Sequence, residues 1–209
     1  MRIPALRHIL LLLVLTLPFA APAQDVQTVY RACTDISRAL VGGSESQFDG
    51  ALTRLEKARV APLQLKVTAG RQPSLDGHLL FDEPFLRALK KDHGVRKLAA
   101  RYARERNLSH RGATSAVKMG TYVVDKKGSL TLKSSARGAK TVAVVGEPNA
   151  RLTLKVTDKA GNVLYADRED VKKGRPERIG TFTVPKGTPI FITVTNRGPS
   201  AASFALITN

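Results

Sequence analysis

The spacing of apolar residues changes near residue 115, and this change constrains the fold more than any other feature. From Asp25 to about Asn107, apolar residues recur every third or fourth position, as on amphipathic helices. Beyond Ser115 they alternate, with turn-forming residues at roughly regular intervals. The pattern predicts an α+β chain, with a mainly helical region over residues 24–115. An antiparallel β-sandwich of jelly-roll or Greek-key type is expected over residues 116–209.

Four helices are expected in the first region. The first ends at Gly42 and Gly43, and the third opens at the acid-acid-proline sequence of residues 82–84, because acidic residues and an early proline favour a helix start. The predicted helices are 25–40, 48–58, one that begins at 82–84, and 95–106. Between the second and third, Leu63, Leu65 and Val67 alternate as a strand would.

Eight short strands are expected in the second region, separated by breaks that contain glycine, proline or asparagine. These residue types favour chain reversal, so each break is predicted to be a turn, including residues 136–138 and 185–187. The predicted strands are 120–125, 129–133, 141–146, 151–157, 163–166, 178–184, 190–195 and 203–208.

Three stretches of the second region carry a resemblance to a known family. They are 152–158 (LTLKVTD) with 161–164 (GNVL), then 187–194 (GTPIFITV), then 204–207 (FALI). Through them, residues from about 117 to 209 resemble the bacterial prepeptidase C-terminal type of jelly-roll module. The resemblance implies an accessory sandwich of secreted proteins, used for binding or folding support, and it carries over no catalytic residues. The acidic residues that would suggest calcium are sparse here, and no protease domain precedes the module.

The first 23 residues have the three parts of an export signal. Arg2 and Arg7 precede an apolar run at 9–17, and small residues at 21–23 fit a cleavage site before Gln24. The run is about half the roughly 20 residues that a membrane span needs. We expect a periplasmic or secreted protein whose mature chain has no transmembrane span.

The mature chain is strongly basic. Removal of the signal takes away Arg2 and Arg7 and no acidic residue, so the formal net charge falls from +17 to +15. Such an excess attracts anionic partners. Outside the cytoplasm these are lipopolysaccharide, lipid headgroups or an anionic polymer. Nucleic acid is disfavoured, because the chain has no tryptophan and only 5% aromatic residues with which to stack bases.

Motifs for metal, nucleotide or nucleophile chemistry are absent from the sequence. The single cysteine, Cys33, lies on the apolar stripe of the first helix and is expected to be buried, with an intermolecular disulfide as the alternative. The histidines show no metal-ligand spacing, so we expect no metal site and no cofactor. His78, Asp82 and Glu83 are close in sequence and could form an acid-base pair, but two acids at a helix start are also favoured by the helix dipole.

The sharpest local feature is a basic helix near residue 100. At about 100° per residue, Lys97, Arg101 and Arg104 share one face, while Val95, Leu98 and Tyr102 share another. We therefore take Arg96, Lys97, Arg101 and Arg104 as the candidate polyanion-binding residues. The alternative is a solvated face above an ordinary core contact.

The sequence favours a binding protein over an enzyme. The expected function is an exported, envelope-associated or secreted binding protein that contacts an anionic envelope component or another envelope protein. One alternative is a cell-envelope hydrolase with a site near His78, Asp82 and Glu83. Another is a structural subunit that uses an exposed sandwich edge for strand addition.

Overall fold

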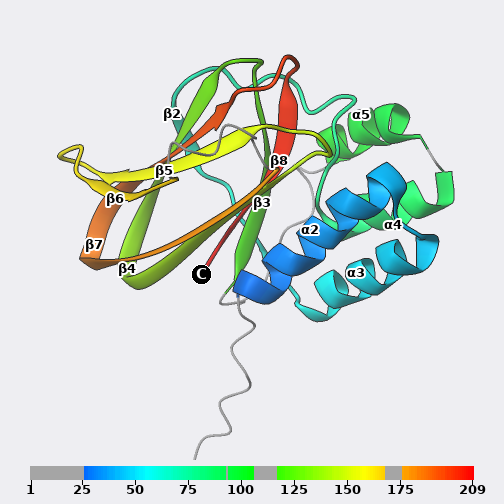
Figure 1. The fold of residues 1–209 in the computed structure, drawn as a ribbon, viewed down its shortest axis with the longest axis horizontal. Helices are drawn as coiled ribbons and strands as arrows, with labels where there is room; N and C mark the ends of the chain where they lie inside the picture. Colours follow the sequence, from blue (N-terminus) through cyan, green and yellow to red (C-terminus); the bar gives the residue numbers. More distant parts are fainter. Residues whose placement is uncertain (1–25, 93, 106–116, 168–175) are drawn as a thin grey trace, which may run out of the picture.

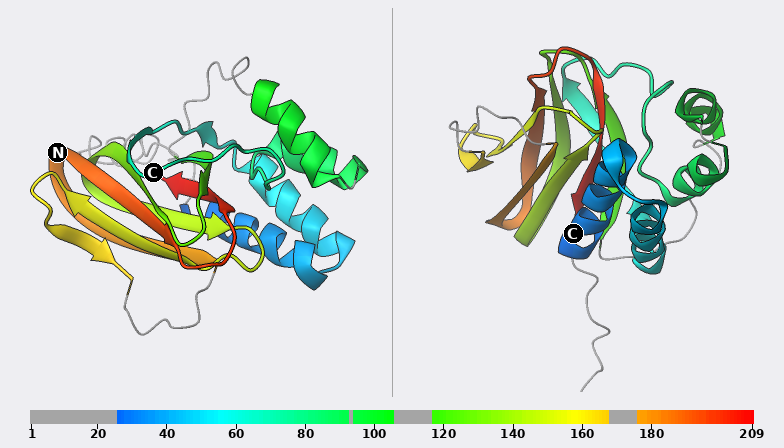
Figure 2. Two further views of the ribbon diagram at one scale, coloured as in Figure 1. Left: turned by 90° about the horizontal axis from the view of Figure 1, so that it is seen from above. Right: turned by 45° about the vertical axis from the view of Figure 1, so that its right-hand side comes forward.

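A layer of helices packs on one side of a strongly bent β-sheet (Figures 1 and 2). The structure is a computed structural model that describes residues 26–92, 94–105, 117–167 and 176–209. The helices are α2 (Val26–Gly42), α3 (Glu45–Lys57), α4 (Glu83–Asp92) and α5 (Val95–Glu105). The strands are β1 (Ala61–Pro62), β2 (Lys66–Ala69), β3 (Lys118–Val124), β4 (Ser129–Gly146), β5 (Leu152–Asp158), β6 (Val163–Ala166), β7 (Glu177–Asn196) and β8 (Ala202–Thr208). The α+β prediction is confirmed.

The helix predictions hold to within a few residues, except at the start of α3. The helix begins at Glu45 rather than near residue 48, because Ser44 and Gln47 form a capping box. The Ser44 side chain accepts from the Gln47 N–H, while the Gln47 side chain accepts from the Ser44 N–H. Two backbone donors at the helix start are thereby satisfied.

The strands form one sheet in the order β1-β3-β8-β4-β7-β5-β6, and β2 pairs with β4 beside this path. Apart from the parallel pair of β1 with β3, neighbouring strands are antiparallel. The short strands β1 and β2 come from the region that is predicted to be mainly helical. They join the first half of the chain to the sheet by backbone hydrogen bonds.

Two predicted turns are wrong, because the chain does not reverse at residues 136–138 or 185–187. The predicted strands 129–133 and 141–146 are one strand, β4, and 178–184 and 190–195 are one strand, β7. The two long strands pair with each other from Ser129↔Thr195 to Val145↔Glu177, with a register shift between Ala136 and Gly138. The turn-forming residues of both strands therefore lie opposite each other at a bulge, where Gly138 and Gly187 have φ of 65° and 76°.

The core consists of two clusters on opposite faces of the central strands. Val142 and Val144 of β4 belong to the cluster inside the bent sheet, whereas Ala143 and Val145 belong to the cluster under the helices. Strand β8 alternates in the same way, and all seven of its residues are buried. A strand that is buried on both faces has a continuous run of apolar residues. This explains the sequence FALI at the centre of β8.

The predicted signal peptide and the predicted boundary at residue 115 both lie outside the described residues. In the part of the chain that the structure describes, no helix is long and apolar enough to cross a membrane.

Candidate functional site

Helix α5 carries the candidate polyanion-binding residues on its outer face. Leu98 is buried in the helix-side core, with Val95 and Tyr102 packed against it, so the apolar face predicted for this helix is confirmed. Arg96, Lys97 and Arg101 are exposed. Arg104 lies within α5, but its side chain is outside the described set.

Two of these arginines are held by contacts other than ion pairs. The guanidinium of Arg101 lies over the Tyr102 ring, 5.1 Å from its centroid, and Tyr102 packs edge to face on Phe85 at 5.8 Å. The stem of Arg96 passes beside Gly77, since a Cβ atom at Gly77 would lie 3.7 Å from the Arg96 Cγ. A cation over an aromatic face keeps its charge available to a second, anionic partner.

The cations of the neighbouring helices are, by contrast, mostly neutralised. Arg87 pairs with Glu83 at 2.5 Å and with Glu56 at 3.0 Å, and Lys90 pairs with Asp49 at 2.6 Å. Among the described residues, no carboxylate forms an ion pair with Arg96, Lys97 or Arg101. The outer face of α5 therefore carries three exposed cations that have no ion pair to a carboxylate in the described part of the chain.

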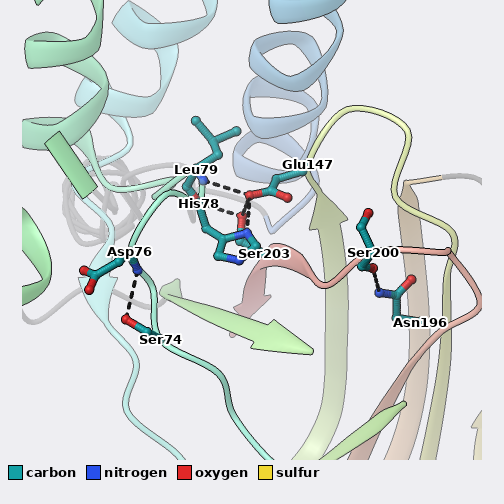
Figure 3. A network of polar contacts seen from close by, with 8 residues as sticks. All are labelled: Ser74, Asp76, His78, Leu79, Glu147, Asn196, Ser200 and Ser203. Atoms are coloured by element: carbon teal, nitrogen blue, oxygen red, sulfur yellow. Dashed lines mark hydrogen bonds and ion pairs between the residues drawn. The ribbon is translucent and has the colours of Figure 1, made fainter. Parts of the chain in front are cut away.

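A second group of polar residues joins the loop before α4 to the sheet (Figure 3). The Glu147 Oε1 atom accepts from the Leu79 N–H at 2.9 Å and from the Ser203 hydroxyl at 2.7 Å, and it lies 2.9 Å from the His78 Nδ1 atom. The Ser203 hydroxyl is also 2.7 Å from the Leu79 carbonyl oxygen. Because a hydroxyl has one proton, Ser203 donates to one of these two acceptors at a time.

This arrangement does not present a nucleophile. The serine touches the carboxylate rather than the imidazole, and Ser203 is fully buried. A nucleophilic serine needs a base within hydrogen-bond reach and access to substrate. The His78–Glu147–Ser203 network is better explained as a joint that fixes the loop of residues 75–82 to the ends of β4 and β8.

The hydrolase alternative grouped His78 with Asp82 and Glu83, and the structure gives each a separate partner. The His78 side chain bonds Glu147, the Asp82 Oδ1 atom accepts from the Phe85 N–H at the start of α4, and Glu83 pairs with Arg87. Sequence reasoning missed Glu147 and Ser203 because Glu147 lies 69 residues after His78, and Ser203 lies a further 56 residues along the chain. Within the described residues, no group of three or more potential ligands could hold a metal ion.

The two ends of the His78–Glu147 pair have shifted pKa values. The hydrogen bond and charge of Glu147 raise the pKa of His78 above 6.5, against a lowering effect of burial. For Glu147, burial is the largest single influence and would raise the pKa. The hydrogen bonds from His78, Ser203 and Leu79 together outweigh it, so the pKa of Glu147 lies below 4.5. At pH values between 4.5 and 6.5 the His78 imidazole is therefore protonated and the Glu147 carboxylate is ionised, so the two side chains form an ion pair.

We expect the free energy of unfolding to fall as the pH rises from 6.5 through the raised pKa of His78. The folded state holds the His78 proton more tightly than the unfolded state, so this stabilisation is complete below pH 6.5 and is lost above the folded pKa. The loss should be below about 1 kcal/mol, because the pair is partly exposed. Denaturant unfolding at pH 5.5 and pH 8 measures it. His78→Gln should remove the difference between the two pH values, and an unchanged pH dependence in this variant would contradict the assignment.

In this fold one bent sheet surrounds a core cluster and carries a layer of helices on one side. Comparisons with known proteins give partial likenesses. No family model matches the chain, and no curated protein matches it. A mitogen of Yersinia pseudotuberculosis is similar over 44% of this chain and 84% of its own, with 12% identity and a TM-score of 0.36. The periplasmic inhibitor of g-type lysozyme from Aeromonas hydrophila is similar over 47% and 90%, with 12% identity and a TM-score of 0.33. The prepeptidase C-terminal domain of a Bacillus anthracis collagenase is similar over 46% and 80%, with 10% identity and a TM-score of 0.28.

Proposed function

We propose that this chain is an exported, envelope-associated binding protein that holds an anionic component on the outer face of α5. In this proposal the protein is periplasmic or secreted. The observation that carries it is the contrast between two sets of cations. Arg87 and Lys90 on α4 are paired with carboxylates, whereas Arg96, Lys97 and Arg101 have none among the described residues.

The binding chemistry follows from this contrast. An uncompensated cation attracts an anion without first breaking an internal ion pair, so it contributes more to binding than a neutralised one. Exposed charges are screened beyond about 8 Å at physiological ionic strength, so binding should weaken steeply as salt is added. The proposed partner is an envelope component with several phosphates or carboxylates. A single small anion would meet only one or two of these side chains.

We expect the combined change Arg96→Gln, Lys97→Gln and Arg101→Gln to weaken binding of inorganic polyphosphate about tenfold at low salt. Each exposed ion pair is worth about 0.2–1 kcal/mol, and about 1.4 kcal/mol corresponds to a factor of ten. Isothermal titration calorimetry at several salt concentrations measures the effect. The melting temperature should barely change, because the three side chains are exposed.

The matched control also replaces three cations by glutamine, but on the strands and turns of the sheet instead of on α5. Lys126→Gln, Lys133→Gln and Lys155→Gln change three exposed lysines that are remote from α5 in the sequence. This control should keep most of the affinity. Equal losses in the two triple variants would show that the charge acts over the whole surface, and binding equal to that of the parent in the α5 variant would refute the proposal.

A further inference from the structure

The four helices enclose a groove of about 360 Å³ at one end of their layer. It is lined by apolar side chains of every helix, namely Leu40 of α2, Phe48 of α3, Leu89 of α4 and Val95 of α5. Sites for small molecules in proteins range over roughly 300–1,000 Å³ and are mostly apolar. The groove therefore has the size and lining of a site for an apolar group.

The C-terminal end of α2 leaves apolar side chains in water beside this groove. Leu40 is 40% exposed and Val41 is 60% exposed, and in the part of the chain that the structure describes the remaining exposed large hydrophobic residue is Val163. Such side chains scattered singly need no explanation. Here Leu40 lines an apolar groove, and Val41 is its neighbour in the sequence.

Charged side chains of both signs lie at the same place. Lys90 lines the groove and is held by Asp49, with Glu45 also lining it. Lys91 follows Lys90 in the sequence, and Arg96 and Lys97 follow Val95. These three cations are exposed and form no ion pair with a described carboxylate, and they outnumber the exposed Asp92 that follows Lys91. An apolar groove beside uncompensated cations is complementary to a molecule with an apolar chain and an anionic head.

We propose that this groove takes an acyl chain of an anionic phospholipid, whose phosphate lies on the cations at the end of α4 and the start of α5. This inference rests on the proposed function and names its ligand class. Long basic side chains suit the task, because their stems cover apolar surface while their heads reach the phosphate. A second copy of the chain is a poorer occupant, since it would bring the same positive charge against itself.

The absence of tryptophan from the sequence allows a direct test. Leu40→Trp places a single indole at the groove mouth, and Phe48→Trp provides a second reporter on the lining of the groove should the first disturb packing. Val163→Trp on β6 is the matched control, because Val163 is exposed to a similar degree, at 56%, and lies on the sandwich. The probe is a vesicle of phosphatidylglycerol with brominated acyl chains, since bromine quenches an indole that it contacts.

We expect brominated phosphatidylglycerol vesicles to quench the Leu40→Trp emission about twofold or more, because an acyl chain in the groove brings bromine into contact with the indole. The Val163→Trp emission should be unaffected. Phosphatidylcholine vesicles of the same chain composition should quench neither, and polyphosphate should bind without quenching.

The experiments distinguish failure of the groove proposal from failure of the proposed function. Vesicle binding with unquenched Leu40→Trp and Phe48→Trp would show that only headgroups are held, which overturns the groove assignment and leaves the proposed function standing. Equal quenching at Val163 would also overturn it. If the parent binds neither polyphosphate nor vesicles, the proposed function itself fails. Reporter quenching that appears without lipid at high protein concentration would assign the groove to a second copy and refute the lipid.

Discussion

A chain that begins at residue 116 is expected to lose cooperative unfolding, although it retains the whole sequence of the sandwich from β3 to β8. The helical layer covers Val117, Val145 and Ile207, which are fully buried in the helix-side cluster. Exposing three such side chains costs about 5 kcal/mol or more. That is the size of the total stability of a small domain.

The truncation also removes specific contacts to the sheet. Strands β1 and β2 are lost, together with the hydrogen bond from the Ser37 hydroxyl to the Gly146 carbonyl and that from the Ser203 hydroxyl to the Leu79 carbonyl. Thermal unfolding followed by circular dichroism, with a chain from Gln24 as control, measures the effect. A sharp, cooperative transition of the fragment would show that the sandwich folds alone and would support a domain boundary at residue 115.

The second large effect is expected for Asp167→Asn. The Asp167 Oδ2 atom lies 2.9 Å from the Arg178 Nε atom, and each side chain is only 8% exposed. By distance the contact is an ion pair, although the Nε–H is not directed at the oxygen well enough for a hydrogen bond. Asp167 also accepts from the Leu154 N–H and the Tyr165 hydroxyl. Burial, with the hydrogen bond to Asp167 as a smaller cause, raises the pKa of Tyr165 to about 12. The Tyr165 hydroxyl therefore stays protonated and can donate to Asp167.

Asparagine has nearly the same shape but leaves Arg178 buried without its counter-charge, and its amide nitrogen cannot accept a hydrogen bond. Removing one partner of a buried ion pair costs about 3–5 kcal/mol. Asp35→Asn is the matched control, because Asp35 and Arg54 pair at 2.6 Å with both side chains over two-fifths exposed. It should cost less than about 1 kcal/mol. Denaturant unfolding compares the two variants, and similar losses would mean that burial does not set the strength of the Asp167–Arg178 pair.

Local features of the fold could be predicted from the sequence, because the information lies within a few residues. The stripe of Val29, Cys33 and Ile36 predicts α2, and all three are buried in the structure. The Ser44-x-x-Gln47 pattern is also a local signal for the start of α3, and it lies just before Phe48, where the apolar spacing alone places that start.

Features set by distant parts of the chain could not be predicted. The sequences at residues 136–138 and 185–187 look like turns, and only their pairing across the sheet shows that they form a bulge. The joint between His78, Glu147 and Ser203 comes from three separate elements, so no spacing reveals it. The basic face of α5 was predicted from the helical period alone. The ion pairs of the α4 cations could not be predicted, because they are formed with Asp49 and Glu56 of α3. The sequence does not show that α3 lies beside α4.

The position of β8 has a consequence for how the chain reaches its folded state. This strand is the last described element along the chain, yet it lies between β3 and β4 and contributes to both core clusters. Contacts between distant parts of a chain slow folding, because loop closure must precede the gain from pairing. An incomplete chain that lacks these seven residues has both cores open at once. The sheet therefore cannot be completed before β8 has been synthesised, and a chain kept extended until then has no stable fold to undo.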